Sequence, residues 1–206
     1  MIDISITLAS GTPEWPGDTP FSCGWTAQIA SGESVNVSMI NTSPHVGTHA
    51  DAPLHVRDGA AGSDRLPLDA FLGPVVVVNL ARHEGVIDRQ ALRDAGLTAT
   101  PARLLLRTDR TIARGAFPDG WPAISAGCAA ELAGDGLLLL GVDCPSVDER
   151  ASKVLAVHHA LFDGGAYVLE NLDLSQVPSG HYDLIALPVK LAGLDAAPVR
   201  AILQHP

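Results

Sequence analysis

The side chains best suited to metal binding and proton transfer are concentrated in one short stretch, residues 43–55, which reads SPHVGTHADAPLH. Three of the eight histidines lie here together with one aspartate, as His45, His49, Asp51 and His55. Imidazole nitrogens and carboxylate oxygens are usual protein ligands of zinc, and they also suit iron and manganese. We therefore expect a metal site, with zinc as the default ion and manganese or iron as alternatives.

The numbering of these four residues predicts that they share one face of an extended chain. All four occupy odd positions, whereas Val46, Ala50, Ala52, Leu54 and Val56 occupy even positions and are apolar. Successive side chains of a strand point to opposite sides, so the polar set would face one way and the apolar set the other.

Neither a helix nor a straight strand would bring these side chains to one ion. In a helix, Asp51 would lie about 160° around the axis from His49, and Pro53 would interrupt the hydrogen bonding. In a straight strand, His45 and His49 would be roughly 13 Å apart, whereas ligand atoms lie about 2.0–2.2 Å from zinc. We therefore expect a bend between the two histidines, which Gly47 permits. The alternative is that the histidines are unrelated surface and core residues around a loop.

A second cluster of candidate ligands follows later in the chain. His158 and His159 are adjacent, and Glu170 lies in an apolar segment, where an unpaired carboxylate is costly to bury. A cation would offset that cost, and Asp51 could bridge two ions because a carboxylate has two oxygens. Spacing alone does not decide between the two histidines. A histidine pair beside a glycine turn such as Gly164 is also common as a purely structural feature.

Trp15 is a weaker candidate for ligand contact. It lies in a turn of sequence EWPGD, where its ring could cover a planar substrate or simply pack. The sequence contains no G-x-S-x-G elbow, no phosphate-binding loop and no G-x-G-x-x-G motif. Serine hydrolase chemistry and nucleotide binding therefore lack their usual support.

The composition is that of a folded globular chain and limits its partners. Of 206 residues, 47% are hydrophobic and 17% charged, with a net charge of −10. We expect neither nucleic acid nor a membrane as partner, because basic patches are lacking and the apolar runs are too short to span a bilayer. The N-terminus lacks a signal-peptide pattern and the three cysteines are widely spaced, which favours a reducing cytoplasm.

Short β-branched and leucine-rich runs predict five buried strands, at residues 2–7, 75–80, 104–107, 137–142 and 184–189. Val35, Val37 and Met39 alternate with polar neighbours, which predicts one half-buried antiparallel strand.

Two helices are predicted from their ends. Asp88 and Ser125 can cap helices that end at Gly96 and Gly134. Because strands outnumber helices, we expect an α/β fold with a mixed sheet in a single domain over residues 1–206, which must bring the two clusters together.

The run H-x-G-T-H-x-D-x-P-x-H at residues 45–55 resembles the signature of the metal-dependent cyclase-like hydrolase family. Further segments extend the resemblance along the chain: WPGD at 15–18, HHA at 158–160, ENL at 170–172 and AGLD at 192–195. Within the family, the chain is similar to bacterial enzymes that hydrolyse N-formyl-L-kynurenine. Relatives that open other aryl-lactam rings, such as isatin, share the core motif.

The resemblance implies a swivelling β/β/α fold that usually assembles as a homodimer. It also implies two Zn²⁺ ions per subunit, with Mn²⁺ or another divalent metal as the alternative. It implies that His45, His49 and Asp51 bind one ion. It also implies that Asp51 and His158 bind the second ion and that Glu170 contacts both.

The resemblance further implies that His55 is the acid/base residue and Trp15 a substrate contact. The expected reaction converts N-formyl-L-kynurenine to L-kynurenine and formate, a step of tryptophan breakdown. A metal lowers the pKa of bound water from 15.7 to about 7, which would supply hydroxide, and His55 could protonate the departing nitrogen. Two alternatives stay open: hydrolysis of another aryl amide or lactam, and a metal-binding protein without turnover.

Overall fold

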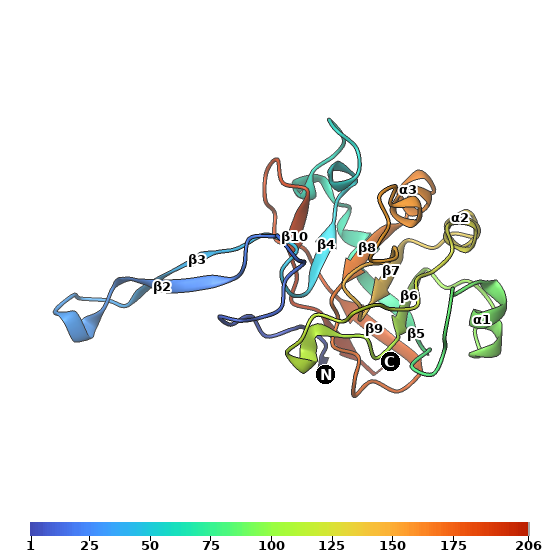
Figure 1. Ribbon diagram of the computed structural model, residues 1–206, viewed down its shortest axis with the longest axis horizontal. Coiled ribbons are helices and arrows are strands. Elements are labelled where there is room, and N and C mark those ends of the chain that lie inside the picture. Colours follow the sequence, from blue (N-terminus) through green and yellow to red (C-terminus); the bar gives the residue numbers. More distant parts are fainter. Residues whose placement is uncertain (206) are drawn as a thin grey trace.

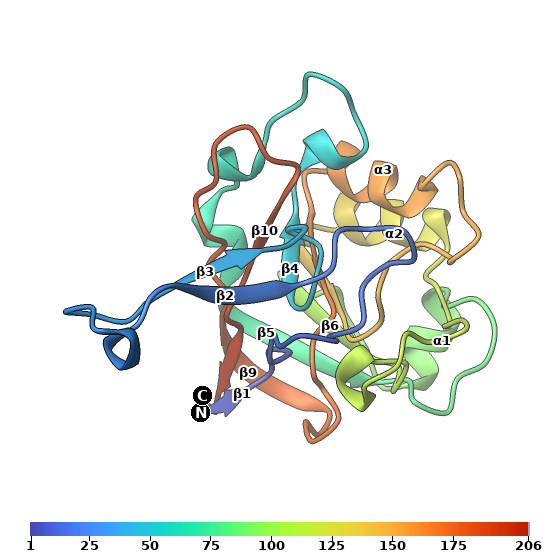
Figure 2. The ribbon, with the colours of Figure 1, turned by 60° about the vertical axis from the view of Figure 1, so that its left-hand side comes forward.

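Nine strands form one mixed sheet within residues 1–205, the part of the chain that the computed structural model describes (Figure 1). Their order is β1-β11-β9-β5-β6-β7-β8-β4-β10. Four neighbouring strands at the centre are parallel, namely β5 (Leu72–Asn79), β6 (Arg103–Arg107), β7 (Leu139–Val142) and β8 (Tyr167–Glu170). The others pair antiparallel, and they are β1 (Ile2–Asp3), β4 (His49–Asp51), β9 (Gly180–Ile185), β10 (Ala196–Pro198) and β11 (Ile202–Gln204). The two ends of the chain lie together because β1 pairs with β11 (Figure 2).

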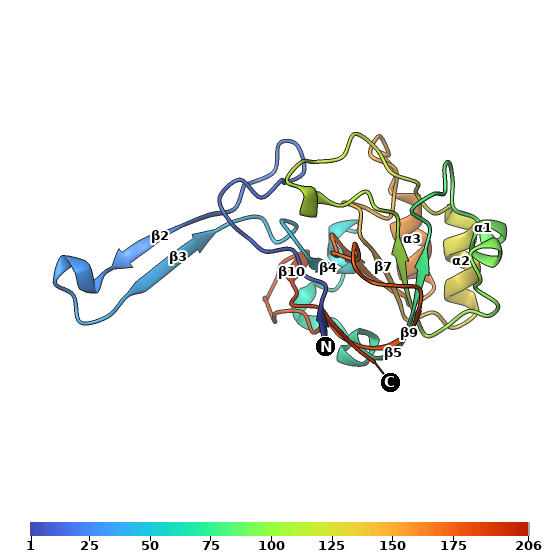
Figure 3. The same cartoon turned by 90° about the horizontal axis from the view of Figure 1, so that it is seen from below.

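Three helices cover one face of this sheet (Figure 3). They are α1 (Arg89–Asp94), α2 (Ala126–Gly134) and α3 (Ala156–Asp163). Alternate residues of β6 enter two different cores: Leu104 and Leu106 pack with the helices, whereas Leu105 packs on the opposite side of the sheet. Because both faces are covered, the central strands read as continuous apolar runs. The structure therefore has the predicted single-domain α/β fold with a mixed sheet.

The two predicted helices are confirmed, including their caps. Asp88 accepts a hydrogen bond from the backbone of Ala91 at 2.8 Å, and Ser125 accepts one from Cys128 at 3.1 Å. Helix α3 was not predicted. It begins after Leu155, which has a left-handed backbone and no side-chain cap of its own.

The strand predictions hold best at the centre of the sheet. Strands β5, β6 and β7 match the runs at 75–80, 104–107 and 137–142. The prediction for 2–7 is wrong beyond Asp3, and that for 184–189 is misplaced, because β9 spans Gly180–Ile185. The strand begins earlier than predicted, in a polar segment, because those residues pair with β5. It also ends before Pro188, which has no N–H to donate to a neighbouring strand.

A two-stranded hairpin, β2 (Ser22–Ala27) and β3 (Val37–Asn41), projects far from the rest of the molecule (Figures 1 and 3). The strand predicted around Val37 and Met39 is present, but all five residues of β3 are exposed, so the prediction of half burial is wrong. No second layer covers this hairpin among the described residues. Trp25 on β2 is 58% exposed and Ile40 on β3 is 67% exposed.

Within residues 1–205, no helix combines the length and the apolar character that crossing a bilayer requires.

Candidate metal centre

The stretch from His45 to His55 folds as a bend, a short strand and a turn. Gly47 has a φ of +73°, and a Cβ there would lie 2.5 Å from a side-chain carbon of Leu8. The predicted bend is therefore confirmed. The alternation is strand-like only over β4, His49–Asp51, and a 3₁₀ turn, Pro53–His55, then brings His55 back to the site.

Asp51 lies at the centre of the cluster and is completely buried. Its Oδ1 is 3.2 Å from Nδ1 of His45 and 3.3 Å from Nε2 of His49. Its Oδ2 is 3.1 Å from Nε2 of His158. The two oxygens of one carboxylate thus face imidazoles that come from distant parts of the chain.

Strand register brings Glu170 to the same place. On the paired strands β4 and β8, His49 lies directly opposite Glu170, so both side chains emerge on one face. Glu170 Oε2 is 3.6 Å from Nε2 of His49, and Oε1 is 3.4 Å from Nε2 of His158. Glu170 also accepts a hydrogen bond from the backbone of Val147 at 2.8 Å, which holds the carboxylate in position.

The first turn of α3 presents His158 to the cluster. Asp148 caps this helix from outside, accepting hydrogen bonds from the backbone of Val157 at 3.0 Å and of His158 at 3.1 Å. The same carboxylate lies 2.6 Å from Nδ1 of His158, which leaves Nε2 for the cluster. His159 lies outside it, with its Nδ1 3.2 Å from the guanidinium of Arg57. The structure thus places His158, and not His159, with Asp51.

One oxygen of Asp51 indicates that the cluster is suited to a divalent cation. Oδ1 of Asp51 is buried and has no hydrogen-bond partner among the described residues, although imidazole nitrogens lie close on two sides. Two sets of side chains have ligand atoms close enough to hold an ion: His45, Asp51 and His55, and His49, Asp51 and Glu170. Both sets include Asp51, and both consist of imidazole and carboxylate ligands.

The electrostatics of the cluster favour positive charge. Burial would raise the pKa of Asp51, but the charge of His49 and the hydrogen bonds with the surrounding histidines together outweigh this effect and hold the pKa well below its usual range. Burial would lower the pKa of His45, whereas its interaction with Asp195 helps to raise it to about 10. Burial likewise opposes charge on His158, yet hydrogen bonds to acidic neighbours raise its pKa well above the usual value. The carboxylates therefore create a site where a cation is stabilised.

The cluster lines a cavity of about 690 Å³ that also has an apolar wall. Trp15 and Phe117 both line this cavity, and their rings meet edge to face with centroids 5.5 Å apart. Trp15 also packs edge-on against Trp121, at 6.0 Å. Trp15 therefore packs and faces the cavity at the same time, so the two roles weighed for it are compatible.

Three residues of the site carry no prediction from the sequence: Phe117, Asp148 and Asp195. Asp195 Oδ2 lies 2.9 Å from Nε2 of His45 and 3.2 Å from Nδ1 of His55, and these hydrogen bonds lower its pKa. No local pattern marks Phe117 or Asp148. Asp195 lies in the AGLD segment that supports the family resemblance, but that segment indicated no role.

The fold and the cluster together define a class: an α/β protein with a buried site suited to a divalent metal. The family model described as putative cyclase matches residues 2–149. The chain therefore belongs to the putative cyclase family, which confirms the resemblance drawn from the motif at residues 45–55.

Proteins of known name resemble this chain over nearly its whole length. A kynurenine formamidase of Bordetella petrii is 42% identical over 203 residues, which cover 98% of this chain and 97% of that protein. One from Bordetella pertussis is 43% identical over 205 residues, with the same coverage. A solved structure of a potential metal-dependent hydrolase with cyclase activity superposes with a TM-score of 0.83 and 28% identity, covering 98% of this chain and 95% of the other.

Replacing Gly47 by alanine should loosen the cluster. The positive φ and the contact with Leu8 both oppose a Cβ, so Gly47→Ala should lower the free energy of unfolding by about 1–3 kcal/mol and weaken divalent-metal binding. Urea unfolding and calorimetric titration with Zn²⁺ measure the two effects. Gly96→Ala is the matched control, because Gly96 has a φ of +96° but no atom within 4 Å of an added Cβ. Equal metal affinity in the two variants would contradict the role of the bend.

Proposed function

We propose that this chain is an arylformamidase that hydrolyses N-formyl-L-kynurenine to L-kynurenine and formate. The observation that carries the proposal is the 42–43% identity, over 98% of the chain, to two proteins named kynurenine formamidase. The cavity supports it, since imidazoles and carboxylates line one part and aromatic rings another. This combination suits an aryl ring that carries a hydrolysable amide.

The proposed metal ligands are His45, His49, Asp51, His158 and Glu170, which would hold two divalent ions, Zn²⁺ by default or Mn²⁺. In each carboxylate the two oxygens face different histidines, which supports an arrangement with two ions. One oxygen of Asp51 faces His45 and His49 while the other faces His158. The oxygens of Glu170 divide in the same sense, one toward His49 and one toward His158. This division supports Asp51 and Glu170 as the two carboxylates that both ions would share.

The second ring nitrogens of these histidines are also engaged, as metal sites require. His49 Nδ1 lies 2.8 Å from the carbonyl oxygen of Gly47, and His158 Nδ1 is held by Asp148. Each ring is therefore fixed with its other nitrogen toward the cluster. Bound divalent ions would supply a nucleophile at neutral pH and would polarise the formyl carbonyl.

The chain's own residues would complete the reaction. Hydrolysis adds the oxygen of water to the formyl carbon and breaks the C–N bond, so the departing aniline nitrogen needs a proton. We assign that transfer to His55, whose ring lines the cavity next to His45 and is 28% exposed. Trp15 and Phe117 would contact the aryl ring and exclude water from that side of the cavity.

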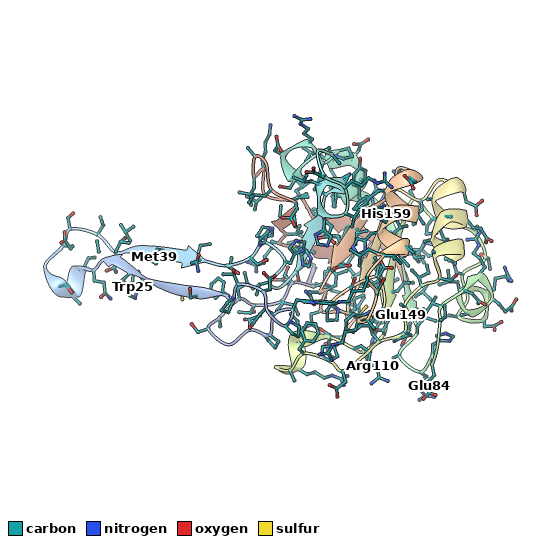
Figure 4. The ribbon with its side chains drawn as sticks, turned by 45° about the horizontal axis from the view of Figure 1, so that its top comes forward. Trp25, Met39, Glu84, Arg110, Glu149 and His159 are labelled. Carbon is teal, nitrogen blue, oxygen red and sulfur yellow. The ribbon has the colours of Figure 1, made fainter. Side chains whose placement is uncertain are left out.

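We also propose that the chain works as a homodimer in the reducing cytoplasm. The three cysteines are free, and two of them, Cys128 and Cys144, are buried. The β2–β3 hairpin carries large apolar side chains that nothing else in the described chain covers (Figure 4). Because Cys23 pairs with Ile40 and Trp25 with Ser38, Trp25 and Ile40 share one face of the hairpin. A second copy of the chain is the partner that would remove this apolar surface from water.

The activity is tested on one preparation of known metal content. We expect formate release from N-formyl-L-kynurenine at close to two metal ions per chain, loss of activity after chelation, and recovery on adding Zn²⁺ or Mn²⁺. Isatin serves as the comparison substrate, since lactam opening is the competing activity. A folded, metal-loaded sample that leaves N-formyl-L-kynurenine intact would exclude the proposed substrate, and turnover of isatin alone would replace it.

Substituting His55 separates proton transfer from metal binding. His55→Ala should keep both ions and lose about 10²–10⁴-fold in kcat, because the departing nitrogen then lacks its proton donor. Metal analysis and steady-state kinetics give the two values. His159→Ala is the control, since His159 lies outside the cluster. If His55→Ala binds one ion fewer, His55 is a metal ligand and the assignment is wrong.

The hairpin variant tests the dimer. Trp25→Asp combined with Ile40→Asp should convert the dimer to a monomer in light-scattering chromatography, because two carboxylates would be buried in the interface. Val86→Asp is the control, an exposed apolar residue outside the hairpin. A wild-type monomer, or a dimer that survives both hairpin substitutions, would refute this interface.

A further inference from the structure

Asp195 forms two hydrogen bonds, with His45 and His55, whose role the proposed reaction does not explain. One oxygen, Oδ2, lies 2.9 Å from Nε2 of His45 and 3.2 Å from Nδ1 of His55. The two rings pack against each other with centroids 4.4 Å apart. A single carboxylate oxygen thus joins the proposed acid/base residue to a proposed metal ligand.

The backbone around Asp195 is fixed to the turn that carries His55. The carbonyl oxygen of Asp195 accepts a hydrogen bond from Ala52 at 2.8 Å, and that of Leu194 accepts one from Ser63, also at 2.8 Å. Strand β10 begins at the next residue and pairs with β4. The carboxylate is therefore held at a set distance from His55 by main-chain contacts on both sides of the turn.

The chemistry of a carboxylate decides which ring nitrogens carry hydrogen. An ionised carboxylate only accepts hydrogen bonds, and a neutral imidazole has one N–H and one lone pair. Toward Asp195, His55 must therefore donate from Nδ1 and His45 from Nε2. The lone pair of neutral His55 is then on Nε2. In neutral His45, the form that binds a metal ion, the lone pair is on Nδ1, the atom 3.2 Å from Asp51.

We propose that Asp195 is a positioning residue that holds His55 in the Nδ1–H tautomer, so that Nε2 is the atom that exchanges the proton with the substrate. The same oxygen holds His45 in the opposite tautomer, with Nδ1 available to a metal ion. This inference rests on the proposed function of His55, but its first consequence, the tautomer, can be observed without any substrate. Asp195 acts through the two rings and transfers no proton itself.

The direct test is the tautomer of His55 in the zinc-loaded protein. In long-range ¹H–¹⁵N spectra of the protein labelled at histidine nitrogen, wild-type His55 should show a protonated Nδ1. Asp195→Ala should shift it toward the Nε2–H form, which free imidazole side chains prefer. Asp195→Asn, which keeps the shape of the side chain, should shift it less. An unchanged Nδ1–H tautomer in Asp195→Ala would overturn the proposal.

Kinetics distinguish positioning from substrate binding. We expect Asp195→Asn to lower kcat by about 10–100-fold with KM on N-formyl-L-kynurenine changed less than about twofold. A raised KM with unchanged kcat would mean that Asp195 binds the substrate, and the proposal would be wrong. Asp64→Asn is the matched control, because Asp64 accepts a hydrogen bond from Gly193 N in the same loop, at 3.5 Å, and forms no hydrogen bond with a histidine within residues 1–205.

A double variant shows which ring transmits the effect. If Asp195 acts on the rate through His55, then His55→Ala with Asp195→Asn should be no slower than His55→Ala alone. A slower double variant, or loss of a metal ion in Asp195→Asn, would assign the effect to His45 and overturn the proposal for His55. If wild type releases no formate, the proposed function fails, yet the spectra still decide whether Asp195 sets the tautomer.

Discussion

The burial of Asp51 is the constraint on which the rest of the site depends. The side chain is fully excluded from solvent, and one of its oxygens lacks any hydrogen bond among the described residues. An unpaired buried charge costs several kcal/mol, so positive charge must lie close to both oxygens. Protonated imidazoles can supply part of it, as the raised pKa of His45 and His158 shows. A divalent cation supplies it without requiring the rings to take up protons.

The sheet is what permits this arrangement. Strand β4 lies between β8 and β10, so its three residues are fixed on both edges by main-chain hydrogen bonds. The apolar residue Ala50 then faces the core, while His49 and Asp51 lie on the opposite face, where His49 lines the cavity and Asp51 is buried beside it. The register with β8 places Glu170 opposite His49. His158 comes from helix α3, on the face of the sheet that the helices cover. Rigid elements therefore carry every ligand candidate except His45, which Gly47 turns inward.

The sequence was sufficient for the local part of the site and insufficient for the long-range part. Residue types at 45–55 indicated a bend and a convergent set of ligands, because both follow from spacing along one segment. The choice of His158 over His159 depends on helix α3, whose start the sequence does not indicate because the residue before it, Leu155, cannot cap it. The side chain that caps this helix is Asp148, which lies outside the helix and earlier in the chain. The central strands were predictable from their apolar runs. The position of β9 depends on its pairing with β5, which no local pattern indicates. The exposure of β3 follows from the lack of a covering layer within residues 1–205, which is a property of the tertiary structure.

The excess of carboxylates over permanent cations links metal binding to the stability of the fold. Asp51, Glu170, Asp148 and Asp195 each contact one or more of the rings of His45, His49, His55 and His158. Within residues 1–205, no lysine or arginine forms a salt bridge with any of these four carboxylates. The unfolded chain would present these groups to water separately, so a cation binds the folded state far better. Any such ligand stabilises the fold by RT ln(1 + [L]/Kd). The acidity that makes the site suitable for hydrolysis therefore also makes the folded protein depend on the ion it binds.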